Sequence, residues 1–136
     1  MGIFDALKIS ASGLAAQRTR MDMVAQNLAN AQTTRTAAGG PYRRKMVVLE
    51  AAKGFRDALA GAGVNVGKIV EDSSPFTELT QPGHPDADAK GMVRYPNVNP
   101  VNEMVDMVAA SRSYDANLSA FETLRGMAMK ALEIGR

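Results

Sequence analysis

The fold is decided by residues 99–118, which read NPVNEMVDMVAASRSYDANL. Asparagine is a favoured N-cap and proline a favoured first helical residue, so Asn99 and Pro100 predict the start of a helix. The positions that follow recur at alternating steps of three and four, which is the spacing of one helix face. This stripe runs through Met104, Met107, Ser111, Tyr114, Leu118, Phe121, Arg125, Ala128 and Leu132. It predicts a helix of about 35 residues, roughly 50 Å long.

A second stripe with the same spacing lies near the N-terminus. It consists of Phe4, Leu7, Ala11, Leu14, Met21, Ala25 and Leu28 and is interrupted once, by Arg18. A helix of about 28 residues would span roughly 42 Å. A seven-residue period sustained over several turns is typical of helices that wind around other helices, so we expect these two to pair.

The middle of the chain predicts short strands and turns. All six prolines lie between Pro41 and Pro100, and proline breaks helices. Residues 42–49, entered through a Gly-Gly-Pro turn, and residues 64–70 have the composition and alternation of strands. Residues 53–60 suggest a short helical or irregular excursion, and 92–95 is the best extended segment of the remainder.

The predicted fold class is therefore mainly α with a small β-rich middle. Long N- and C-terminal helices pair as a coiled coil around a short β or irregular module. We divide the chain into an N-terminal helical segment, residues 1–35, a middle module, residues 36–98, and a C-terminal helical segment, residues 99–136. The two helices carry far more apolar edge than the middle module could cover, so we expect further contacts with copies or relatives of this chain.

Composition excludes several classes of function. The 136 residues carry a net charge of only +2, with 16 basic and 14 acidic side chains, which argues against nucleic-acid binding. There is no cysteine, so neither a disulfide nor a thiolate metal site can form. No segment has the about 20 consecutive apolar residues that a membrane-spanning helix needs. The first residues lack the basic-then-apolar layout of a cleavable signal peptide.

No arrangement of residues indicates catalysis. The single histidine, His84, lies between prolines and acidic residues, and we interpret this stretch as a rigid turn, not as a metal site or a base. The basic run at residues 43–45 predicts a solvated strand edge or a charged contact with a neighbouring subunit. The serines lack a nucleophile motif, and no glycine-rich phosphate loop is present. We expect no enzyme activity, cofactor, metal or small-molecule substrate.

Several stretches match a known family. Residues 27–34, NLANAQTT, resemble the Asn-x-Ala-Asn-x-x-Thr motif that ends the N-terminal helix of flagellar rod and hook proteins, and a Tyr-Arg pair follows it here at Tyr42. The stretches GHPDAD at 83–88 and YPNVN at 95–99 are similar to the short proximal-rod members in particular. So are the residues of 103–117, EMVDMVAASRSYDAN.

This resemblance implies a structural subunit of the bacterial flagellar basal body. Such proteins are exported unfolded, without signal cleavage, and assemble into a torque-transmitting rod that spans the periplasm. The implied partners are copies of the chain itself, the rod proteins FlgB, FlgF and FlgG, and the adaptor FliE. The residues we expect at the assembly interface are Phe4, Leu7, Leu14, Met21, Asn27, Leu28, Asn30, Met104, Met107, Tyr114, Leu118, Phe121 and Leu132.

Other interpretations remain open at this point. A sister axial protein such as FlgB, or a truncated distal-rod protein, would share the terminal helices. A coiled-coil export adaptor or chaperone would also present amphipathic helices, although such proteins are usually acidic and entirely helical. We further expect residues 1–35 and 99–136 to be mobile in the isolated chain and to become ordered on assembly.

Overall fold

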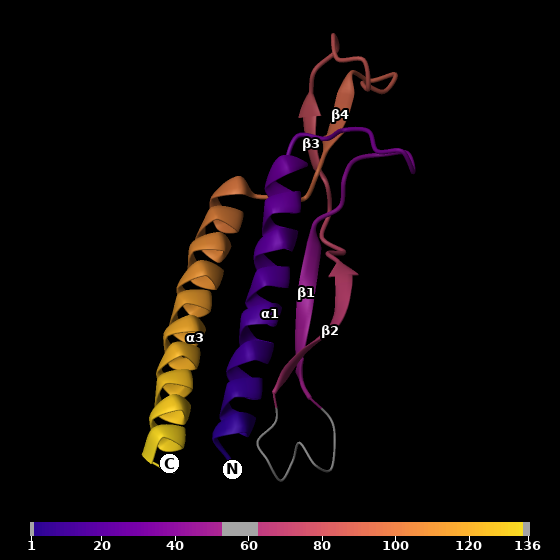
Figure 1. The fold of residues 1–136 in the computed structure, drawn as a ribbon. Coiled ribbons are helices and arrows are strands. Elements are labelled where there is room, and N and C mark those ends of the chain that lie inside the picture. Colours follow the sequence, from indigo (N-terminus) through magenta and orange to yellow (C-terminus); the bar gives the residue numbers. More distant parts are fainter. Residues whose placement is uncertain (1, 53–62, 135–136) are drawn as a thin grey trace.

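The computed structural model describes residues 2–52 and 63–134. It contains two long helices and two antiparallel hairpins, which confirms the predicted fold class (Figure 1). The excursion expected at 53–60 lies outside the described residues. The elements are α1 (Ile3–Ala29), β1 (Lys45–Ala51), β2 (Val64–Glu71), β3 (Thr77–Thr80), β4 (Met92–Tyr95) and α3 (Pro100–Ile134).

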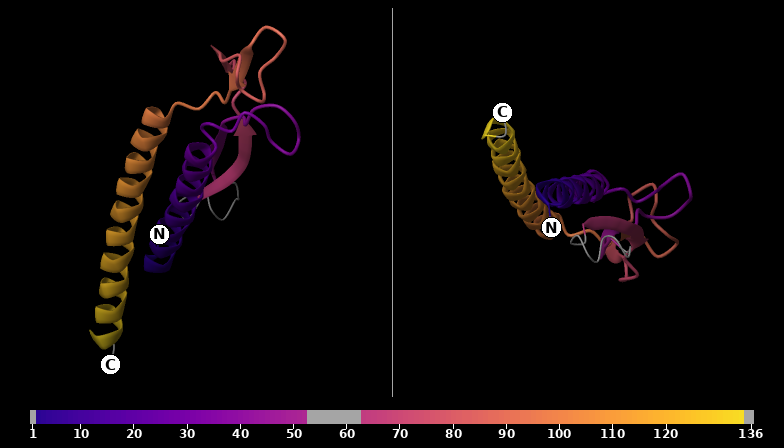
Figure 2. Two further views of the ribbon diagram at one scale, coloured as in Figure 1. Left: turned by 90° about the horizontal axis from the view of Figure 1, so that it is seen from above. Right: turned by 60° about the horizontal axis from the view of Figure 1, so that its bottom comes forward.

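The two helices lie side by side and run in opposite directions. Glu103, in the first turn of α3, bonds to Asn27 near the end of α1, and Asn117 lies against Gly13. The 27 residues of α1 span about 40 Å and the 35 residues of α3 about 52 Å. The last turns of α3 therefore extend past the start of α1 (Figure 2, left).

The start of α3 follows the expected capping. The side-chain Oδ1 of Asn99 accepts hydrogen bonds from the backbone N–H groups of Val101, at 3.0 Å, and Asn102, at 3.3 Å. Two of the N–H groups that a helix start leaves without partners are thereby satisfied. The helix begins where the asparagine–proline pair predicts.

The β1–β2 hairpin lies on the side of α1 opposite α3 (Figure 1). Its register pairs Lys45 with Glu71 at one end and Ala51 with Val64 at the other, with an irregularity after Val48. Both strands were expected from the sequence. The hydroxyl of Ser12 on α1 accepts a hydrogen bond from the N–H of Val64 at 3.0 Å and ties β2 to the helix.

The β3–β4 hairpin projects beyond the C-terminal end of α1 (Figure 1). The connection from α1 to β1 turns at Gly39 and Gly40, whose φ angles are +86° and +76°. Other residues rarely adopt such values, so the pair of glycines is required by the turn.

The core is small for a chain of this length. In the part of the chain that the structure describes, the buried apolar residues are Ala16, Val24, Tyr42, Val93, Pro96 and Ala110. Many large apolar side chains of α3 are exposed instead. Neither helix, over its described residues, has a stretch apolar enough to cross a membrane.

Candidate functional site

Asn27, in the last turn of α1, is a buried side chain whose polar atoms are all hydrogen-bonded. Its Nδ2 donates to the carbonyl of Lys45 and to Oε2 of Glu103, both at 2.9 Å. Its Oδ1 accepts from the Tyr42 hydroxyl and from the Lys45 N–H, both at 3.0 Å. An amide offers two donors and two acceptor sites, and here all four are used. One buried side chain thus joins α1, β1 and α3.

Glu103 completes this arrangement from the first turn of α3. Its side chain is fully buried, and its Oε1 accepts a hydrogen bond from Nε of Arg44 at 2.6 Å. A buried carboxylate is costly unless it is paired and bonded, and Glu103 has a partner on each oxygen. We call Asn27, Tyr42, Arg44 and Glu103 the polar clasp.

Weaker contacts surround the polar clasp. Arg44 also approaches Asp106 at 3.4 Å and Asp72 at 3.6 Å, and its backbone N–H donates to Oδ1 of Asn97 at 2.8 Å. Asp106 in turn accepts from Arg20 on α1 at 3.1 Å. Since the Arg20–Asp106 pair is more than one third exposed, it contributes little beside the buried pair.

Two residues of the polar clasp and the neighbouring Asp72 have shifted pKa values. Burial raises the pKa of Tyr42, and the charge of Glu103 raises it further. Burial alone would lower the pKa of Arg44, but the hydrogen bond and charge of Glu103, with the other acidic neighbours, raise it overall. The pKa of Asp72 is lowered, chiefly because the backbone N–H of Ser74 donates to its carboxylate.

The family motif at residues 27–33 has a structural explanation. Asn27 belongs to the polar clasp, whereas Asn30 closes the helix, since its Nδ2 donates to the carbonyl of Gln26 at 2.9 Å. The Thr33 hydroxyl donates to Oδ1 of Asn30, and the Thr33 carbonyl accepts from the N–H of Tyr42. These residues end α1 and direct the chain back toward β1.

One interpretation of the basic run at 43–45 is wrong. The run was expected to form a solvated strand edge or a charged contact with a neighbouring subunit. The Arg44 side chain instead forms ion pairs within the chain, which contradicts the solvated edge, and a contact of the run with a neighbouring subunit stays a prediction. The guanidinium of Arg43 lies 4.3 Å from the centre of the Phe76 ring, and the ammonium of Lys45 lies 5.9 Å from that of Tyr42. The sequence alone does not reveal that the carboxylate of Glu103 lies close to this run.

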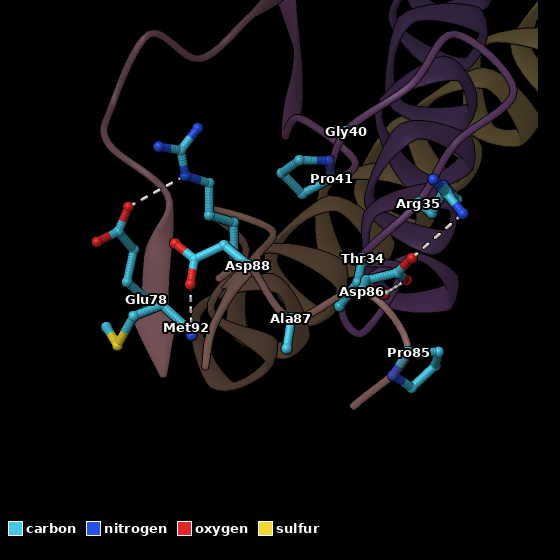
Figure 3. A pocket seen from close by; sticks show the side chains of 11 residues that line it. Thr34, Arg35, Gly40, Pro41, Glu78, Pro85, Asp86, Ala87, Asp88 and Met92 are labelled. Atoms are coloured by element: carbon cyan, nitrogen blue, oxygen red, sulfur yellow. Dashed lines mark hydrogen bonds and ion pairs between the residues drawn. The ribbon is translucent and has the colours of Figure 1, made fainter. Parts of the chain in front are cut away.

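A shallow pocket of about 520 Å³ lies between the α1–β1 connection and the loop before β4 (Figure 3). Thr34 donates to Asp86 at 2.8 Å, and Arg35 pairs with the same carboxylate at 3.5 Å. His84 belongs to the turn in this loop, where its Nδ1 accepts from the N–H of Asp86 at 3.1 Å. In the described residues no three metal-binding side chains gather here. The polar groups of this pocket hold two loops together.

The contact between α1 and α3 includes several small and polar residues. Asn117 fills the space above Gly13, where an added Cβ would lie 3.0 Å from its side chain. The buried Oε1 of Gln17 has no hydrogen-bond partner among the described residues. Small or polar residues therefore line much of the seam between the helices.

The opposite side of α3 is apolar at its start. There Val101, Met104, Val105 and Val108 are 67%, 57%, 64% and 52% exposed. We call these four residues the outer face of α3. A self-sufficient globular protein usually covers such a cluster of large apolar side chains, and here no described residue covers it.

The structure divides each predicted stripe into two rows. The row of Leu7, Leu14, Met21 and Leu28 is partly covered, as is the row of Met107, Tyr114, Phe121 and Ala128. The alternate rows, which include Phe4 on α1 and Met104, Leu118 and Leu132 on α3, are exposed. Of the two predicted asparagines, Asn27 is buried and Asn30 half-buried. Whether these residues form an assembly interface stays a prediction.

The chain matches two families along its sequence. Residues 7–35 match the family described as flagella basal body rod protein, and residues 89–134 match the C-terminal part of the flagellar basal body rod FlgEFG proteins. The chain is 49% identical to the flagellar basal-body rod protein FlgC of Bacillus subtilis, and the match covers all of both chains. It is 41% identical to FlgC of Salmonella typhimurium, again over all of both, and 45% identical to FlgC of Aquifex aeolicus, over 98% of this chain and 97% of that one.

Proposed function

This chain belongs to the FlgC family of flagellar basal-body rod proteins and is a structural subunit of the proximal rod, and we propose that the exposed apolar rows of its two long helices are the surfaces that pack against neighbouring subunits. Within these surfaces the outer face of α3 is one continuous apolar part.

The exposed apolar residues at the start of α3 support this proposal. The polar clasp and the Gly13–Asn117 contact occupy the side that faces α1. Val101 and Val105, on the other side, remain more than 60% exposed. Burying one such side chain contributes about 1.5–3 kcal/mol, so covering this face in an assembly would be strongly favourable.

The half-covered rows complete the proposed assembly surface. Leu7, Leu14, Met21, Leu28, Met107, Tyr114 and Phe121 would lose their remaining exposure, while Phe4, Met104, Leu118 and Leu132 would be newly covered. We propose that residues 1–35 and 99–136 form the core of the rod and that 36–98 form a module at its surface. Asn27 and Asn30 would act indirectly, by holding α1 in place.

We base the proposed identity of the neighbouring proteins on membership of this family. We propose that the chain packs against copies of itself and contacts FlgB, FlgF, FlgG and FliE within a rod that crosses the periplasm. We also propose export without signal cleavage and a role without catalysis, cofactor or nucleic acid. Ordering of both terminal segments on assembly stays a prediction.

The first experiment compares a strain that lacks this gene with one that produces Leu118→Asp. Leu118 belongs to the exposed row and is 37% exposed, so under this proposal a charge there would be covered, unpaired, in an assembled rod. We expect both strains to be non-motile, with basal bodies that stop at the membrane ring and are restored by the intact gene. Ser119→Asp, on the next residue of the same helix, is the matched control and should swim.

Two outcomes would separate the parts of this proposal. Complete, rotating flagella in the strain without the gene would contradict the rod role and favour an export adaptor. Normal motility with Leu118→Asp alone would leave the rod role standing and remove this row from the interface.

A further inference from the structure

The β3–β4 hairpin is joined to the rest of the chain by two short linkers. Residues 72–76 lead into it from β2, and residues 96–99 lead out of it to α3. The hairpin projects from the molecule in Figure 1, and among the described residues its strands make no extensive contact with the other helices and strands. Its orientation would therefore vary unless other contacts hold the linkers in place.

One side chain binds both linkers. Asn97, in the second linker, donates from Nδ2 to the carbonyl of Asp72 at 3.1 Å. The same nitrogen donates to the carbonyl of Ser74 at 3.3 Å and to its hydroxyl oxygen at 2.9 Å. The Oδ1 of Asn97 accepts from the backbone N–H of Arg44, just before β1, at 2.8 Å. Asn97 thus connects the two linkers of the hairpin to each other and to the start of β1.

Arg43 binds the same two carbonyls. Its Nη1 donates to the carbonyl of Asp72 at 2.8 Å and to that of Ser74 at 3.2 Å. Its guanidinium also lies 4.3 Å from the centre of the Phe76 ring, at the end of the first linker. Hydrogen bonds from a charged donor are stronger than those between neutral groups. We call Arg43, Asn97 and the carbonyls of Asp72 and Ser74 the hairpin anchor.

Two other features of the hairpin are less suited to set its orientation. Val93 of β4 is fully buried, but the burial of apolar surface has no preferred direction, whereas hydrogen bonds do. In the loop before β4, Asp86 binds Thr34 and Arg35 across the pocket of Figure 3. The Arg35 side chain is 77% exposed, so its ion pair contributes little.

We propose that the hairpin anchor is a conformational lock, which fixes the angle between the β3–β4 hairpin and the rest of the free chain. Each linker also contains a proline, Pro75 or Pro96, which restricts the backbone further. A surface that is already held in one orientation loses less entropy when it meets a partner. The lock is a property of the free chain and does not depend on the proposed function.

Distances between two spin labels test the lock in the isolated full-length chain. The sequence has no cysteine, so Lys68→Cys on β2 and Leu79→Cys on β3, both at exposed positions, place one label on each hairpin. We expect a single narrow distance distribution from this pair. Adding Asn97→Ala should make the distribution about twofold broader or more, because both linkers lose their common partner.

Two matched variants separate the hairpin anchor from other contacts of the same region. Asn99→Ala, two residues farther along the second linker, removes hydrogen bonds at the start of α3 and should leave the distribution narrow. Asp86→Ala removes the contact across the pocket and should broaden the distribution less than Asn97→Ala does.

Arg43→Met decides the question if Asn97→Ala loses its helix content in circular dichroism. Methionine keeps an unbranched apolar side chain at this position but removes the donor to both carbonyls, so this variant should also broaden the distribution.

Three results would overturn the lock. The first is a broad distribution from the labelled chain with an intact hairpin anchor. The second is a distribution that stays narrow in every folded variant of Asn97 and Arg43. The third is a larger effect of Asp86→Ala than of Asn97→Ala, which would assign the orientation to the contact across the pocket. The strain without the gene tests the rod role separately, and none of these three results would change its outcome.

Discussion

The two sides of the first turns of α3 differ in chemistry. On the side that faces α1, a fully buried carboxylate, Glu103, is bonded to Asn27 and Arg44. On the other side, Val101 and Val105 face solvent. A buried ion pair is a weak source of stability, because desolvation offsets much of its attraction, but it accepts few alternative geometries. We infer that the polar clasp holds α3 in one position while its apolar side stays available to neighbours.

The sharpest test of this comparison places the same charge on each side of α3. Ala110→Asp puts an unpaired carboxylate at a position that is 0% exposed and should lower the free energy of unfolding by about 4 kcal/mol or more. Val105→Asp, five residues earlier on the outer face, should change it by less than about 0.5 kcal/mol. Chemical denaturation of the isolated chains would measure both. Equal losses would contradict the division into two sides.

The next largest effect concerns the carboxylate of the polar clasp. Glu103→Ala leaves Arg44 and Asn27 without their shared partner and should cost about 3 kcal/mol. Asp106→Ala, one turn farther along α3, removes only a part-exposed ion pair and should cost less than about 1 kcal/mol. The same denaturation experiment measures both. A Glu103 variant as stable as the Asp106 variant would show that the polar clasp does not hold α3.

Asn27 tests whether the polar clasp acts through its amide. Asn27→Ala removes four hydrogen bonds and takes a partner from the buried side chains of Tyr42 and Glu103, so we expect a loss of about 2 kcal/mol. Asn30→Ala removes the bond to the carbonyl of Gln26 at the helix end and should cost about 1 kcal/mol or less. If the order of the two losses were reversed, helix capping would matter more than the polar clasp.

The smallest expected effect is a dependence on alkaline pH. The pKa of Tyr42 is raised above its ordinary value of 10.0, so the folded state favours the neutral hydroxyl. Its contribution to stability is complete below about pH 10 and is lost as the pH rises from there through the raised pKa. The difference in unfolding free energy between the native chain and Tyr42→Phe should therefore shrink above pH 10. A constant difference from pH 8 to 11 would contradict this.

Much of the fold could be predicted because the signals are local. The Asn99–Pro100 pair marks the start of α3, and the residues 42–49 and 64–70 show strand composition. The interpretation of the run at 43–45 failed because the partner of Arg44 lies 59 residues away, on another element. An ion pair between segments that are far apart in the sequence produces no repeating pattern of residues from which it could be predicted.

For the assembly surface, the sequence determined the seven-residue period of the two helices and the apolar residues that carry it. It did not determine which row of each stripe is used within the chain. That choice was made by tertiary contacts: Asn27 with Glu103, and Gly13 with Asn117, set the rotation of α3 against α1. This rotation half-covers the row of Met107 and Tyr114 and exposes Met104 and Leu118. Apolar periodicity shows that a helix has an apolar face that must be buried. Which part of that face stays exposed for a neighbouring subunit is decided by the tertiary contacts that fix the rotation of the helix.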